Sequence, residues 1–119
     1  MLFSEVCLFT KDVVTLADFY KCILKTTSDC EDEVHQQIKT QGATLSIYNN
    51  GDVKDSKNEN ISIAFTVDDV DEEFERLKQL GVQIKEPPTT RPWGARNMLF
   101  YDPDGNLVVF RSFASEKNM

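Results

Sequence analysis

The chain has 119 residues, of which 40% are hydrophobic and 28% are charged, a composition typical of one globular domain. Thirteen Lys and Arg against 20 Asp and Glu give a net charge of −7, which disfavours binding to nucleic acid or to anionic membranes. The apolar runs are too short to span a membrane and the N-terminus shows no secretory pattern, so we expect a cytoplasmic protein.

The first half predicts one strand, one helix and three short strands. Residues 2–9 are rich in β-forming side chains. A helix then begins near residues 12–15, where Thr15 and Asp18 resemble a capping box and Asp12 is a rival N-cap. It ends near Lys25. Its apolar face comprises Leu16, Phe19, Tyr20, Ile23 and Leu24. The three strands are expected near residues 26–30, 34–39 and 43–48.

The second half predicts the same order of elements. Residues 61–67 alternate between bulky and small side chains, as a strand does. Asp69 is the expected N-cap of a helix that Gly81 ends. Three strands follow near residues 82–85 (ended by Pro87-Pro88), 97–101 and 107–110, the last two joined by a tight turn at 102–106.

The repeated order predicts an α+β fold of two βαβββ modules with mostly antiparallel, curved sheets. We expect a single domain over residues 1–119, with modules of about 1–50 and 61–113, a polar linker of about 51–60 and a frayed tail at 115–119. Helices should cover the outer face of each sheet. The other faces should form a concave, largely apolar cleft. Strand alternation assigns to them Glu5, Cys7, Phe9, Ser62, Ala64, Thr66, Leu107, Val109 and Arg111.

Few residues suit catalysis or metal binding. The three cysteines, Cys7, Cys22 and Cys30, form no CxxC motif, and their odd number favours reduced thiols. His35 is the only histidine, so one chain cannot supply a two-histidine metal site.

The segment from Asp102 to Phe110, DPDGNLVVF, resembles the C-terminal signature of the vicinal-oxygen-chelate superfamily. That superfamily includes glyoxalases, extradiol dioxygenases and bleomycin-resistance proteins. Residues 63–71 are similar to the strand-to-helix junction of its second module. The corresponding junction of the first module resembles Lys11-Asp12 together with Asp18-Phe19-Tyr20. Residues 92–96 look like the loop before the penultimate strand. The resemblance covers nearly the whole chain.

In metal-dependent members, four inward positions supply His and Glu ligands. The resemblance places these positions on Glu5, at or near Leu45, on Ser62 and on Val109. Glu5 alone could bind a metal, and one carboxylate does not hold a divalent ion. The resemblance therefore implies no metal, no cofactor and no assigned catalytic residue. It favours the bleomycin-resistance type, whose dimers bind a bulky ligand without turning it over.

Three further readings stay open. Trp93 either stacks on a planar ligand or folds back on the core, and Arg96 either pairs with a ligand anion or is solvated or salt-bridged. Glu5 could recognise a cation, act as a base, or have a partner inside the cleft.

The leading hypothesis is a metal-independent homodimer that sequesters a small aromatic or cationic molecule. The alternatives are a glyoxalase-like lyase or dioxygenase with other metal ligands, and an interaction module.

Overall fold

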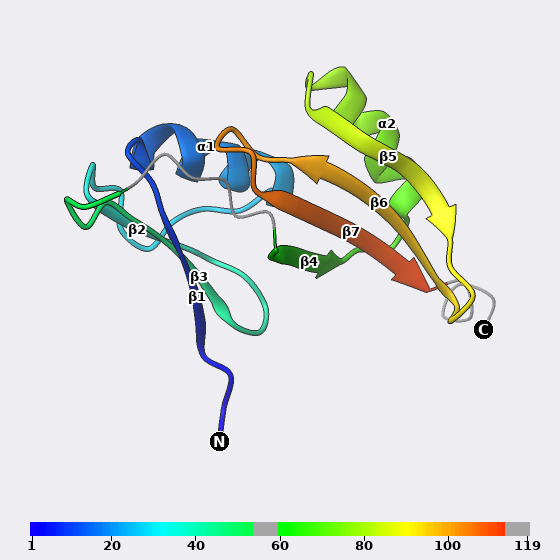
Figure 1. The fold of residues 1–119 in the computed structure, drawn as a ribbon, viewed down its shortest axis with the longest axis horizontal. Coiled ribbons are helices and arrows are strands. Elements are labelled where there is room, and N and C mark those ends of the chain that lie inside the picture. Colours follow the sequence, from blue (N-terminus) through cyan, green and yellow to red (C-terminus); the bar gives the residue numbers. More distant parts are fainter. Residues whose placement is uncertain (54–59, 114–119) are drawn as a thin grey trace. The chain divides into compact units, whose positions relative to one another are not determined.

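The computed structural model describes residues 1–53 and 60–113 (Figure 1). The chain divides into two compact units, Met1–Ser56 and Lys57–Met119. Most of the predicted linker and the predicted tail lie outside the described residues. The single-domain assignment stays a prediction.

Each unit contains one helix and one sheet. Unit one has β1 (Glu5–Phe9), α1 (Val13–Leu24), β2 (His35–Ile38) and β3 (Thr44–Tyr48), and unit two has β4 (Ser62–Thr66), α2 (Val70–Gln79), β5 (Gln83–Thr90), β6 (Ala95–Tyr101) and β7 (Leu107–Phe113). The strand orders are β1-β3-β2 in sheet one and β4-β7-β6-β5 in sheet two. In each sheet the first strand runs parallel to the last, and the other neighbours are antiparallel. The predicted α+β class is confirmed. In the described part of the chain, neither helix has the length and apolar character that crossing a membrane requires.

In unit one, α1 packs on one face of sheet one. Its buried residues are Val13, Leu16, Ala17, Tyr20 and Ile23, and those of the sheet include Leu8, Ile38, Leu45 and Ile47. The helix begins after Asp12, whose carboxylate accepts hydrogen bonds from the backbone N–H and the hydroxyl of Thr15. The predicted Thr15 capping box is therefore wrong, and the rival N-cap is correct. These bonds lower the pKa of Asp12, so the cap stabilises the helix at neutral pH and this contribution is lost as the pH falls through that lowered pKa.

The predicted strand at residues 26–30 is wrong, because the structure reduces it to one bridge between Ser28 and Ile38. The Ser28 hydroxyl donates to the Cys30 carbonyl and accepts from the Cys30 N–H. This local turn competes with regular ladder formation. The first strand also begins later than predicted, at Glu5.

Strand β5 does not end at Pro87-Pro88, as the sequence predicted, but continues to Thr90. It lies at the edge of sheet two, where a proline can be accommodated because one row of N–H groups has no ladder partner. The register with β6 shifts between Ile84 and Glu86 and again between Glu86 and Thr89, which places the prolines in irregular pairing.

In unit two, α2 covers one face of sheet two. The buried residues between them are Val70, Leu77, Met98, Phe100, Val108 and Phe110. Asp69 caps the helix as predicted, accepting from the N–H groups of Asp71 and Glu72. Gly81 has a φ of 79°, which suits the chain reversal after the helix.

The DPDGN segment is a turn held by Asp102, which is 5% exposed. Its Oδ1 accepts from the backbone N–H groups of Asp104 and Asn106, both at 2.9 Å. Its Oδ2 accepts from Asn106 Nδ2 at 2.8 Å. The signature thus fixes the geometry between β6 and β7, and its side chains are engaged with one another.

Candidate functional site

The two faces of sheet two are distinguished by their contacts with α2. The Val70 N–H donates to Ser112 Oγ at 3.4 Å, and the Arg96 guanidinium binds both carboxylate oxygens of Asp71 at 2.9 Å. The even-numbered residues of β6 and β7 therefore lie on the helix side. The odd-numbered residues lie on the other side, here called the open face of sheet two.

Strand register arranges the open face of sheet two in three rows across β4, β7 and β6. The rows are Thr66–Arg111–Asn97, Ala64–Val109–Leu99 and Ser62–Leu107–Tyr101. All nine residues are exposed or half-buried. Phe65, on the other side of β4, packs edge-on against Phe110 with ring centroids 6.1 Å apart. The predicted alternation of β4 and β7 is thus confirmed, with an apolar middle row beside a polar one.

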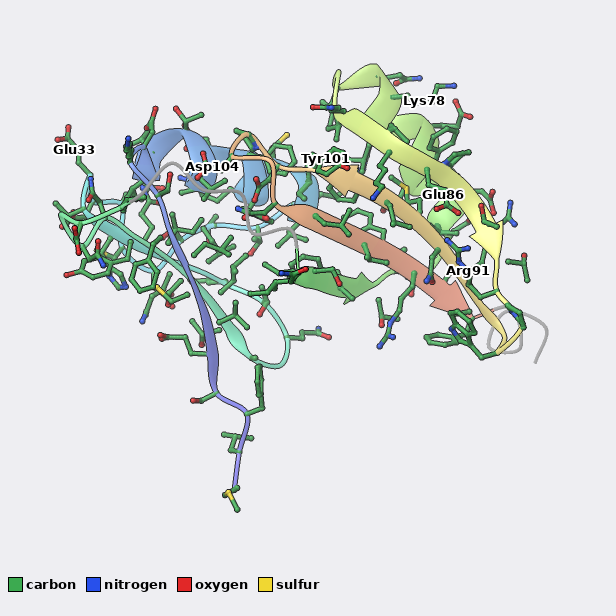
Figure 2. All side chains as sticks on the ribbon, in the orientation of Figure 1. Glu33, Lys78, Glu86, Arg91, Tyr101 and Asp104 are labelled. Carbon is green, nitrogen blue, oxygen red and sulfur yellow. The ribbon has the colours of Figure 1, made fainter. Side chains whose placement is uncertain are left out.

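Arg111 differs from the other arginines of the chain. Arg76 pairs with Glu73, and Arg91 with Glu86 in a contact of 2.6 Å (Figure 2). Arg96 pairs with Asp71. The Nε of Arg111 donates to Thr66 Oγ1 at 3.3 Å, and its guanidinium lies 5.4 Å from the centre of the Phe113 ring. Within residues 1–53 and 60–113, no carboxylate pairs with Arg111.

The face of sheet one opposite its buried residues is called the open face of sheet one. One row there is aromatic: the rings of Phe9 and His35 lie 6.1 and 5.7 Å from that of Tyr48. The next row is Cys7–Ser46–Gln37. Ser46 is 1% exposed, and its Oγ has no hydrogen-bond partner among the described residues. Burial first, and the charge of Glu5 second, raise the pKa of the Cys7 thiol, which disfavours its use as a nucleophile.

The sequence-predicted residues fall into four places. Glu5, Cys7 and Phe9 lie on the open face of sheet one. Ser62, Ala64, Val109 and Arg111 lie together on the open face of sheet two. Arg96 lies on the α2 side, in the salt-bridged arrangement that the sequence left as an alternative. Trp93 lies in the β5–β6 loop and is 72% exposed.

Asn97 and Ser46 are not among the residues predicted from the sequence to line a site. Their side-chain oxygens are buried without a partner in the described part of the chain. The alternation of the strand predicted at 97–101 could have placed Asn97 on the same face as Leu99 and Tyr101. Ser46 was obscured because the register near Leu45 was open, and its burial depends on neighbouring strands.

The donor set does not fit a divalent metal. Leu45 is 3% exposed and lies opposite Val6 on the α1 side, so the nearby open-face positions are Thr44 and Ser46. Neither they nor Ser62 and Val109 supply a carboxylate or an imidazole. No group of three or more His, Cys, Asp and Glu residues that could hold a metal occurs in the described part of the chain.

A family model described as Glyoxalase/Bleomycin resistance protein/Dioxygenase superfamily matches residues 2–110. The chain belongs to this superfamily. A search of curated proteins finds no match.

Solved structures of superfamily proteins share the fold. A glyoxalase-related enzyme from Fulvimarina pelagi is 19% identical with a TM-score of 0.78, over 92% of this chain and 86% of that one. A family enzyme from Burkholderia phytofirmans PsJN is 15% identical with a TM-score of 0.79, over 95% and 99%. A glyoxalase/bleomycin resistance protein/dioxygenase from Nocardioides is 21% identical with a TM-score of 0.76, over 93% and 82%. Identities this low indicate a shared fold alone.

Proposed function

We propose that this superfamily member is a metal-independent protein that sequesters a small aromatic or cationic molecule without turning it over. The observation that carries the proposal is the open face of sheet two, where the apolar row of Ala64, Val109 and Leu99 is bordered by a few polar side chains. Small-molecule sites have this composition. The aromatic row of sheet one offers a second surface on which a planar ligand could stack.

A thermal-shift screen with 3-phenyllactate, phenethylamine and benzamide tests the proposal. A ligand present at 100 times its Kd adds about 2.7 kcal/mol to the free energy of unfolding, which raises the Tm by several degrees. We expect at least one probe to do so and to be recovered chemically unchanged. If no probe raises the Tm, or if the bound probe is converted, sequestration is the wrong function.

The purified protein should carry no stoichiometric transition metal, because Glu5 is the one suitable donor among the four family positions. Metal analysis by mass spectrometry measures this directly. About one Ni, Zn, Fe or Mn per chain, lost in Glu5→Gln, would instead support the lyase or dioxygenase alternative.

We also propose that the protein is a homodimer, with the ligand bound in a cleft that the dimer completes. The support is that β1 and β4 are each the edge of their own sheet, and edge strands present backbone groups to which another chain can pair. Light scattering at tens of micromolar should give twice the chain mass of 13.6 kDa. A mass of one chain would contradict the dimer.

Trp93→Ala should change the free energy of unfolding by less than about 0.5 kcal/mol, because a side chain that is 72% exposed contributes little to packing. In the wild-type protein, a probe that binds beside the β5–β6 loop should quench or shift the Trp93 emission. Urea unfolding and fluorescence titration measure the two effects. A loss of several kcal/mol would show that Trp93 is a core residue.

A further inference from the structure

The open face of sheet two carries Arg111, which lacks a counter-charge in the described chain. We infer that Arg111 binds the carboxylate of a 2-hydroxy acid with an apolar side chain. This inference deepens the proposed function, on which it rests, by favouring an aromatic acid over a cation as the ligand of this face.

The charge pattern supports an anionic ligand. In a chain of net charge −7, Arg76, Arg91 and Arg96 all pair with carboxylates, whereas Arg111 pairs with none in the described residues. Glu86, in register with Leu99 at the edge of the sheet, is already paired with Arg91 at 2.6 Å. Among the residues that the structure describes, the positive charge of Arg111 therefore has no carboxylate partner on its own sheet face.

The guanidinium of Arg111 is also oriented. Thr66 Oγ1 accepts from its Nε at 3.3 Å, and the ring of Phe113 lies 5.4 Å from its central carbon. Contacts from two strands reduce the freedom that the side chain would lose on binding. A carboxylate is the anion that fits the planar donor fork of arginine, because two parallel hydrogen bonds can form.

Asn97 adds a second requirement on the ligand. It lies directly opposite Arg111 in the antiparallel ladder, on the same face, so their Cβ atoms are about 5 Å apart. Its Oδ1 is buried and has no partner in the described part of the chain. A buried acceptor without a donor is costly, so a ligand gains affinity if the Asn97 side chain turns toward it and accepts its hydrogen bond. A hydroxyl on the carbon next to the carboxylate is such a donor.

The apolar part of the ligand follows from the neighbouring row. Ala64, Val109 and Leu99 are each two residues away from the polar row on their own strands, a distance of about 7 Å. This spacing suits an aromatic or branched aliphatic group one or two bonds from the carbon that bears the carboxylate and hydroxyl. At the far end, Lys85 Nζ lies 6.0 Å from the centre of the Tyr101 ring and adds positive charge.

The test is a titration of the ¹⁵N-labelled full chain followed by amide NMR shifts. The probes are 3-phenyllactate, its amide, 3-phenylpropanoate (which lacks the hydroxyl) and phenethylamine. We expect phenyllactate to shift the amides of β6 and β7 and to bind about tenfold more tightly than the amide or phenethylamine. Phenylpropanoate should bind more weakly than phenyllactate, and this difference should vanish in Asn97→Ala.

Arg111→Gln should weaken phenyllactate binding about tenfold, whereas Arg76→Gln on α2 makes the same change of net charge away from the face and should have no effect. Arg111→Lys keeps the charge but not the planar fork, so its affinity for phenyllactate should lie between those of Arg111→Gln and Arg76→Gln. The dispersion of the amide spectrum shows directly whether each variant is folded.

Equal losses in Arg111→Gln and Arg76→Gln, or no loss in either, would overturn the inference and show a merely solvated arginine. Tighter binding of phenethylamine or of the amide would overturn the carboxylate preference and leave the proposed function standing. If no probe shifts any amide, both fail.

Discussion

Phe110→Ala is expected to lower the free energy of unfolding by about 3–5 kcal/mol. Phe110 is 1% exposed and lies on the helix side of β7. Its ring meets those of Phe100 and Phe65 nearly at right angles, with centroid distances of 5.0 and 6.1 Å. Removing it would leave a cavity among three strands, β4, β6 and β7, that small side-chain shifts cannot fill. Urea unfolding should show a lower midpoint at an unchanged slope.

The neighbouring variant Val109→Ala is the matched control. Val109 is half-buried and points to the open face of sheet two, so its truncation should cost no more than about 1 kcal/mol. The contrast between adjacent residues tests the assignment of the two faces. Similar losses in both variants would mean that the open face is packed as tightly as the helix side, and would argue against a ligand there.

Asp102→Ala is expected to cost about 2–3 kcal/mol, since one buried carboxylate accepts three hydrogen bonds in the turn between β6 and β7. The backbone N–H of Asn106 would be left buried without this acceptor. The turn sets the pairing of Tyr101 with Leu107 and hence the register of the open-face rows. The variant should therefore also weaken the binding of any ligand to the open face of sheet two.

Two further variants distinguish the stabilisation that comes from these hydrogen bonds from that of the turn sequence itself. Asp102→Asn keeps one acceptor oxygen but presents an amide to Asn106 Nδ2, so its loss should lie between wild type and Asp102→Ala. Asp104→Ala removes an exposed carboxylate from the same turn and should cost less than about 1 kcal/mol. Equal costs for Asp104→Ala and Asp102→Ala would show that turn propensity, and not the buried carboxylate, stabilises the segment.

Features set by local chemistry could be predicted from the sequence. The alternation of residues 61–67, the Asp69 cap and the Gly81 stop each depend on a few consecutive residues, and the structure confirms them. The turn at residues 102–106 is likewise encoded in its own side chains.

Features that depend on partners distant in the sequence could not be predicted from it. Asp12 and Thr15 are both good N-caps, and the choice between them depends on where α1 meets its sheet. The salt bridge of Arg96 joins it to Asp71, 25 residues earlier, so strand alternation alone could not reveal it. That Arg111 pairs with no carboxylate of residues 1–53 and 60–113 emerges only when the partners of the other arginines are known.

The prolines of β5 have a consequence for assembly. Pro87 and Pro88 are adjacent in β5, so one removes an N–H donor from the outer edge of sheet two and the other from the side that faces β6. The register shifts around them also make this edge irregular. Strand β4, at the opposite edge, contains no proline. The two edges of sheet two therefore differ in whether another chain can add a strand to them: β5 disfavours such pairing and β4 permits it. A chain that paired along β4 would then meet no second regular edge on sheet two, which would oppose further growth through that sheet.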